Sequence, residues 1–234
     1  MPNTVRSDAR APAQTLQIKA FAPRQPKQAP NSDVAFTPMV KATQAARGSR
    51  KAYEKMEARG GFHDRVTDDL AAFLAGVDTA YLATANADGQ PYAQHRGGPQ
   101  GFIRVIDDRT IGFADFAGNR QYITTGNLAE NAKAFLFLMD YAHRRRLKLW
   151  GRARMVDDDP DLLARLMPKG YAARAEQAIL FEIEAWDVNC PQHIPRKLDA
   201  ADVADAIARL KTRIAVLEAE NSELTLSLRN LTSR

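Results

Sequence analysis

The middle of the chain, residues 79–189, consists mainly of short segments in which apolar and polar residues alternate, as β-strands require. TAYLATA and QPYAQHR flank NADG, whose Asp88-Gly89 step predicts a tight hairpin. A second hairpin is predicted where DDR lies between GFIRVI and TIGFAD, and a third where AHRR lies between KAFLFLMDY and RLKLWGRARMV. One more strand is predicted for AILFEIEAWDV. These closely spaced strands predict a mainly β protein, a β-barrel with added helices, rather than the strand–helix alternation of a Rossmann sheet.

Three shorter segments have helical patterns. Residues 42–59 predict an exposed helix that ends at the glycine pair 60–61. Thr67 predicts the N-cap of a second helix, because Asp68 and Asp69 then lie in its first turn, where the helix dipole favours acidic side chains. DPDLLARLM predicts a third helix before the last strand.

Residues 199–234 carry a heptad pattern in which apolar residues recur at alternating spacings of three and four. Ile at a with Leu at d favours a parallel two-stranded coiled coil, and one buried Asn at a fixes its register. Arg213 and Glu218 have opposite signs at g and e, which suits the same pairing. The alternative is an amphipathic helix docked on its own domain. The a positions are Ile207, Ile214, Asn221 and Leu228, and the d positions are Leu210, Leu217, Leu224 and Leu231.

These patterns divide the chain into an N-terminal arm, residues 1–41, a barrel domain, residues 42–198, and the C-terminal helix, residues 199–234. Residues 1–47 contain seven Lys or Arg and two Asp and so account for the whole net charge of +5. Basic arms rich in Pro and Ala are usually flexible. The neutral remainder, and PRKLDAADVADA where a DNA-binding zipper has a continuous basic helix, argue against a nucleic-acid partner.

The sequence also argues against a membrane partner and a metal site. No apolar run approaches the roughly 20 residues of a membrane helix, and the first 30 residues lack a secretory signal, so we expect a cytoplasmic protein. The four histidines, at 63, 95, 143 and 193, lack a ligand spacing, and the single Cys190 excludes paired CxxC ligands. No nucleophile elbow is present.

Two segments favour a phosphate or another anion. In HRGGPQG, residues 95–101, glycines allow main-chain N–H groups to approach a ligand beside two cationic side chains. In DFAGNRQYITTGN, residues 115–127, a strand is followed by a helix start that carries an arginine and two threonines. Alternation in RLKLWGRARM places Arg146, Lys148, Trp150, Arg152 and Arg154 on one strand face, where one or two cations could close the pocket.

Four segments, in this order and spacing, resemble the pyridoxamine 5′-phosphate oxidase-like FMN-binding proteins, and in particular a branch that carries NCPQHI. They are GQPYAQHRGGPQGFIRV, FADFAGNRQYITTGNL, LKLWGRARM and EAWDVNCPQHIPRK, and the resemblance covers about residues 45–197. It implies a split β-barrel that forms a homodimer, with FMN bound at the subunit interface. The segment with Gln192 and His193 would approach the flavin from the partner subunit.

The resemblance implies a homodimeric FMN-dependent oxidoreductase that passes electrons to oxygen or another acceptor. The chain lacks the Arg/Lys-rich strand motif and the C-terminal segment that clamp the vitamin B6 substrate, so that substrate is not implied. His193 is a candidate at the reactive face, or it is structural. The cofactor-binding candidates are His95, Arg96, Gly97, Gly98, Asp115, Asn119, Arg120, Thr124, Thr125, Arg146, Trp150, Gln192 and His193.

Two other functions are compatible with the same residues. The chain could be a non-catalytic flavin or haem carrier or sensor whose zipper recruits a partner, with His95, His143 or His193 as an axial haem ligand. Relatives of this fold also use a deazaflavin, so the pocket could select that longer cofactor instead of FMN.

Overall fold

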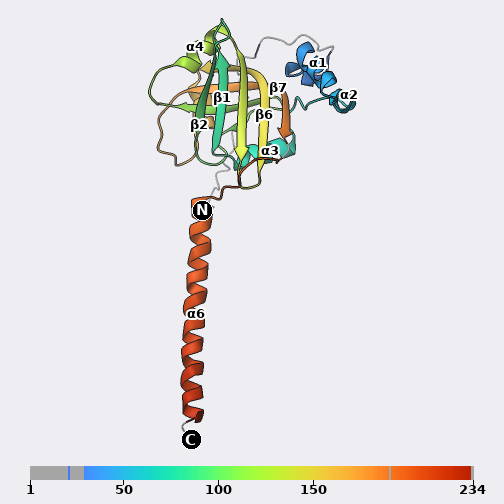
Figure 1. Ribbon diagram of the computed structural model, residues 1–234. Coiled ribbons are helices and arrows are strands. Elements are labelled where there is room, and N and C mark those ends of the chain that lie inside the picture. Colours follow the sequence, from blue (N-terminus) through green and yellow to red (C-terminus); the bar gives the residue numbers. More distant parts are fainter. Residues whose placement is uncertain (1–20, 22–28, 190, 233–234) are drawn as a thin grey trace, which may run out of the picture.

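The computed structural model describes Phe21, residues 29–189 and residues 191–232. In this part of the chain seven strands form one antiparallel sheet with the order β2-β1-β5-β6-β7-β4-β3. Figure 1 shows the long strands curling around a common interior, so the predicted split β-barrel with added helices is confirmed. The strands are β1 (Thr79–Ala85), β2 (Pro91–Gly97), β3 (Arg104–Val105), β4 (Thr110–Phe116), β5 (Lys133–Asp140), β6 (Arg145–Val156) and β7 (Ala175–Asn189).

The hairpin between β1 and β2 follows from its turn residues. Gly89 has a φ of +85°, which the left-handed turn position requires, and its N–H donates to the Asn86 carbonyl at 3.1 Å. The Asn86 side chain accepts from the Gln90 N–H at 2.8 Å. The three hairpins predicted from sequence are all present as antiparallel pairs, so their turns are confirmed.

The interior is filled by alternate residues of the strands. Leu147 and Leu149 on β6 are fully buried, whereas Arg146 and Lys148, which alternate with them, are partly exposed, as alternation predicted. On β7 both faces are buried, because α5 (Pro160–Leu166) covers Leu180 and its neighbours on the side away from the interior. This double burial explains why β7 contains the continuous apolar run AILF.

The helices before the sheet differ from the prediction. A 3₁₀ turn, η1 (Asn31–Val34), is followed by α1 (Pro38–Ala46) and α2 (Arg50–Glu57), so the single helix expected over residues 42–59 is wrong. The helical conformation is interrupted at Gly48, whose φ is +79°. η1 and the start of α1 thus lie within residues 29–41 of the arm that was predicted over residues 1–41, and residues 1–20 and 22–28 of that arm lie outside the described residues.

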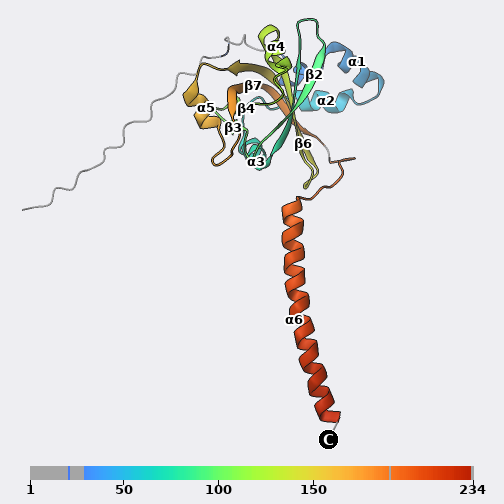
Figure 2. The ribbon, with the colours of Figure 1, turned by 90° about the vertical axis from the view of Figure 1, so that its left-hand side faces the viewer.

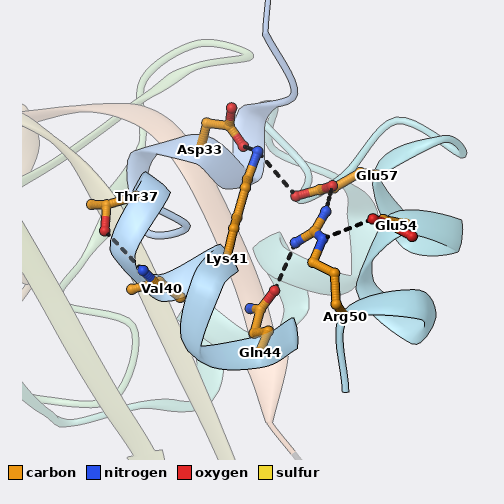
Figure 3. A network of polar contacts seen from close by, with 8 residues as sticks. All are labelled: Asp33, Thr37, Val40, Lys41, Gln44, Arg50, Glu54 and Glu57. Atoms are coloured by element: carbon orange, nitrogen blue, oxygen red, sulfur yellow. Dashed lines mark hydrogen bonds and ion pairs between the residues drawn. The ribbon is translucent and has the colours of Figure 1, made fainter. Parts of the chain in front are cut away.

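Opposite charges join η1, α1 and α2. The Lys41 ammonium lies 2.6 Å from an Asp33 oxygen and 3.5 Å from a Glu57 oxygen, and Arg50 contacts the other Glu57 oxygen, as Figure 3 shows. The hydrogen bond from Lys41 to Asp33 raises the pKa of Lys41. Behind this network, the Phe62 ring stacks on Trp150 with 5.4 Å between centroids, so this segment covers part of the outer face of β6.

The other three described helices lie at the ends of the barrel. α3 (Asp68–Gly76) begins after Thr67, whose hydroxyl accepts from the Leu70 N–H at 3.3 Å, which confirms the predicted cap. α4 (Ile123–Glu130) and α6 (Ala200–Thr232) lie at opposite ends of the barrel in Figure 1. Within the described ranges, no helix combines the length and apolar character that crossing a bilayer requires.

α6 does not pack on its own barrel. None of its described residues is buried, and Figures 1 and 2 show it projecting away from the barrel in both views. The alternative of an amphipathic helix docked on its own domain is therefore wrong.

Replacing Gly151 is expected to destabilise the barrel. The sheet register shifts between Trp150 and Gly151, and an added Cβ at Gly151 would lie 2.1 Å from the Glu182 carbonyl oxygen. Gly151→Ala should therefore reduce the free energy of unfolding by about 3 kcal/mol, measured by chemical denaturation. The control is Gly126→Ala in α4, where an added Cβ meets nothing within 4 Å and should be neutral or stabilising by about 0.5–1 kcal/mol. Equal losses in both variants would contradict this explanation.

Candidate functional site

The candidate site lies at the split of the barrel, where two strands that are not neighbours in the sheet approach each other. β2 is an edge strand, and β4 lies at the other side of the strand order. The Arg96 guanidinium on β2 contacts the Asp115 carboxylate on β4, and both side chains are only 12% exposed. One ion pair thus joins the two sides of the split.

Asp115 is tied to further polar groups, whereas within the described residues Arg96 is not. The second Asp115 oxygen accepts from the Gln177 amide at 2.9 Å, and the same amide nitrogen lies 3.2 Å from the Thr125 hydroxyl. These bonds connect β4 and β7 to α4. Arg96 Nε is buried and has no hydrogen-bond partner among the described residues.

The chain enters α4 through a strained loop. Arg120 and Tyr122 have φ values of +58° and +53°, although neither is glycine. Such conformations cost about 1–2 kcal/mol per residue and occur preferentially at functional sites. No described side chain caps α4 at Tyr122, so the first N–H groups of the helix carry an uncompensated partial positive charge.

α4 itself is fixed by side-chain hydrogen bonds to the strands beneath it. The Thr124 hydroxyl donates to the Gln94 amide oxygen on β2 at 2.8 Å. The Asn127 amide donates to the Thr84 hydroxyl on β1 at 3.0 Å, within the barrel. The position of the helix start relative to Arg96 is therefore set by the sheet.

These elements surround a pocket of about 270 Å³. Two polar residues that line the pocket, Gln94 and Glu176, were not identified from the sequence, and neither was Gln177, which donates to Asp115. Alternation with Arg96 could have indicated Gln94, but the other two become neighbours only through the β4–β7 register. The predicted residues that line the pocket are Arg96, Asp115, Asn119, Arg120, Thr124 and Thr125.

The charges of the pocket are nearly balanced. Arg120 lies 3.4 Å from Glu176, and Arg174 lies 3.0 Å from the same carboxylate oxygen. Arg120 is 58% exposed, so its guanidinium is free to turn toward a ligand, whereas Arg96 is held by Asp115. An anion in this pocket would therefore have to compete with the Glu176 carboxylate for an ion pair with Arg120.

A family model described as pyridoxamine 5′-phosphate oxidase matches residues 66–190. The chain belongs to this family. The match covers the strands, α4 and the pocket, and it confirms the resemblance found in the sequence. No curated protein matches the chain.

The solved structures that are similar to this member of the family have low sequence identity to it. HupZ from Group A Streptococcus is 16% identical, with a TM-score of 0.44, over 57% of this chain and 99% of that one. A putative pyridoxamine 5′-phosphate oxidase from Lactobacillus delbrueckii is 20% identical, with a TM-score of 0.41, over 53% and 95%. An FMN-binding protein from Syntrophomonas wolfei is 14% identical, with a TM-score of 0.39, over 65% and 95%.

In this family member the glycine loop is a packing feature of the chain. The Gly98 and Gly101 N–H groups donate to the Asp78 and Val77 carbonyls at 3.1 and 2.9 Å, so the expectation that these two groups approach a ligand is wrong. An added Cβ at Gly98 would lie 2.8 Å from Phe102 Cβ. Gly97 and Gly98 do not line the pocket.

Three other predicted residues lie on the outer face of the sheet, opposite to the side on which Arg96 points. The His95 ring lies 5.7 Å from the Tyr81 ring, its neighbour across the strands. Trp150 packs beneath Phe62. Arg146 precedes the buried Leu147 on β6 and points the other way, with a buried Nε that has no hydrogen-bond partner among the described residues.

The last two predicted residues lie in the turn after β7. Gln192 and His193 are exposed, and His193 has a φ of +61°. Neither lines the pocket of its own chain. Across the described residues, no three His, Cys, Asp or Glu side chains gather as a metal site would require.

Removing the charge of Asp115 should destabilise the barrel, because Arg96 would keep a mostly buried charge without its partner. Asp115→Asn is expected to reduce the free energy of unfolding by about 2–4 kcal/mol in thermal or chemical denaturation. The control is Asp187→Asn, which breaks the more exposed pair with Lys148 at 2.9 Å and should cost about 1 kcal/mol or less. Similar losses in the two variants would show that the buried Arg96–Asp115 pair contributes no more to stability than the more exposed pair.

Proposed function

We propose that this chain is a homodimeric FMN-binding oxidoreductase whose flavin phosphate binds in the pocket at the start of α4. The observation that carries the proposal is the uncapped helix start facing Arg96 and Arg120. Helix N-termini and arginines are the groups that proteins use to bind phosphate. Membership of the pyridoxamine 5′-phosphate oxidase family supports the same assignment.

The residues present fit a phosphate with one restriction. Arg96 offers a buried Nε without a hydrogen-bond partner, and Asn119, Thr124 and Thr125 add neutral polar groups to the lining. Asp115 holds Arg96 in place and lowers the net charge of the pocket. Phosphate binding therefore depends on Arg120 leaving Glu176.

The size of the pocket supports a second copy. A volume of about 270 Å³ lies below the roughly 300–1,000 Å³ of ligand pockets in general, so one chain would enclose only the phosphorylated end of FMN. The remaining predicted residues, His95, Arg146, Trp150, Gln192 and His193, lie outside this pocket. We propose that these residues instead contribute to the flavin site of a partner subunit.

The outer face of the sheet is suited to that contact. Tyr81 is 38% exposed, and Phe135, Phe137 and Met139 are only partly buried on the same face. Aromatic and methionine side chains are enriched at the centres of protein interfaces. A second copy would bury them.

The flavin, when bound, would supply hydride and electron transfer, and the acceptor would be oxygen or another oxidant. The chain's part is to bind and orient it. Arg96 and Arg120 would neutralise the phosphate, α4 would fix its position, and the partner subunit would exclude water from the ring. His193 is our candidate for a polar group at the reactive face.

The absorption spectrum of the purified protein tests the cofactor. We expect flavin bands near 375 and 450 nm (approximate values) and release of FMN on heating, identified by its mass. A deazaflavin mass would change the cofactor. A Soret band, or a colourless protein that does not bind added FMN, would overturn the proposal.

Arg120→Ala should weaken FMN binding, because it removes a charged hydrogen bond to the phosphate. We expect a loss on the order of 1.5–3 kcal/mol in binding free energy, measured by flavin fluorescence titration. Arg174→Ala is the matched control, since Arg174 is similarly exposed and pairs with the same Glu176 but does not line the pocket. Equal affinities of the two variants would remove Arg120 from the phosphate site.

Glu176→Gln should act in the opposite direction. It removes a negative charge from the pocket and releases Arg120 from its ion pair. FMN affinity should rise by about two- to tenfold in the same titration, and the gain should shrink at high salt. A lower affinity would mean that Glu176 is needed to position Arg120.

A further inference from the structure

α6 exposes an apolar seam that Asn221 interrupts at one position. Its length of 33 residues corresponds to about 50 Å of helix. The apolar seam residues are Ile207, Leu210, Ile214, Leu217, Leu224, Leu228 and Leu231, which are 44–73% exposed in the single chain. Exposed apolar surface of this extent marks an interaction site.

We propose that this seam pairs with α6 of a second copy of the chain as a parallel, in-register two-stranded coiled coil. The chain's own barrel does not cover the seam, because α6 projects away from the barrel and is joined to it only at the start of the helix (Figures 1 and 2). Lys197 fixes this attachment, since its N–H donates to the Tyr141 carbonyl at 3.4 Å and its ammonium lies 4.1 Å from the Tyr141 ring. Ile194, just before it, is buried.

The residue types at the seam select a second copy in parallel orientation. β-branched Ile at a with Leu at d favours two parallel strands. Asn221 occupies one a position, and its amide can both donate to and accept from the same amide of a parallel partner. In an antiparallel pair a positions face d positions, so Asn221 would face a leucine and lose its hydrogen bonds.

The charges beside the seam are self-complementary. In a parallel pair Arg213 at g lies beside Glu218 at e of the partner, twice by symmetry. Charge alone does not select the orientation, because Lys211 and Glu218 attract each other in an antiparallel pair. The orientation is decided by Asn221.

A parallel pair holds both barrels at the same end of the coiled coil. Tethering the two barrels in this way raises the effective concentration of one outer sheet face near the other. Their association is therefore favoured without any additional interaction between them. An antiparallel pair would separate the barrels by about the length of the helix, roughly 50 Å. The coiled coil is therefore compatible with the proposed flavin site but does not rest on it.

Disulfide crosslinking of the full-length chain tests the orientation. With Cys190 replaced by Ser, Leu210→Cys and Leu231→Cys each place a thiol at a d position near one end of the seam. We expect both variants to form covalent dimers on mild oxidation, and Thr212→Cys, at an outer position, to form few. An antiparallel pair would crosslink neither d variant, and crosslinking of all three alike would indicate random collision; either result overturns the proposal.

A matched pair of substitutions tests the seam itself. Leu224 and Leu226 are 64% and 59% exposed, but only Leu224 lies in the seam. Leu224→Asp should raise the dimer dissociation constant at least tenfold in analytical ultracentrifugation, whereas Leu226→Asp should leave it unchanged. Equal effects, or a trimeric mass for the unaltered chain, would overturn the two-stranded seam.

Flavin content separates this inference from the proposed function. Chains truncated after Leu198 should keep FMN while their dimer weakens, since the barrel interface persists. Crosslinked chains without any flavin binding would overturn the proposed function alone. Flavin-bound chains that fail to crosslink at Leu210 and Leu231 would overturn the coiled coil alone.

Discussion

The ion pair between Arg96 and Asp115 is the constraint on which the candidate site depends. It joins β2 to β4 across the split, with both side chains mostly buried. Such a pair adds little stability over apolar packing, but losing one partner is costly. Asp115 also accepts a hydrogen bond from Gln177, whose amide in turn donates to Thr125, so these residues are positioned by the same ion pair. The pocket therefore depends on side chains that also close the barrel, so substitutions of Arg96 or Asp115 should change the shape of the pocket and the stability of the barrel together.

The alternation of β2 gives the strand two roles. Gln94 and Arg96 point toward α4 and the pocket, whereas His95 points to the outer face beside Tyr81. A period of two places neighbouring residues on opposite faces of a sheet, so one strand can serve its own pocket and a contact with another copy. The candidate residues His95 and Arg96 on β2 therefore lie on opposite faces of the sheet.

Local patterns were readable from the sequence, and contacts between distant segments were not. Turn residues such as Asp88-Gly89, the Thr67 cap and the helical pattern of α6 each depend on residues close in the chain, and the structure has the hairpin, the cap and the helix where they were expected. The meeting of Arg96 with Asp115 depends on barrel closure, which no spacing encodes. Gly98 was misread because a glycine that admits Phe102 and a glycine that admits a ligand look alike in sequence. The helix break at Gly48 shows how one left-handed glycine overrides a helical pattern.

The pairing of β7 with distant segments has a consequence for how the chain folds. The Trp186 N–H donates to the His63 carbonyl at 2.7 Å, and its indole donates to the Arg65 carbonyl at 2.8 Å, across more than 100 residues. Contacts of such long sequence separation form slowly, because their loop must close first. During synthesis the barrel cannot close until β7 has emerged, and α6 follows it. The segment that closes the barrel is therefore synthesised before the helix that we propose to pair with a second copy. This order would favour association of folded barrels over association of unfolded chains.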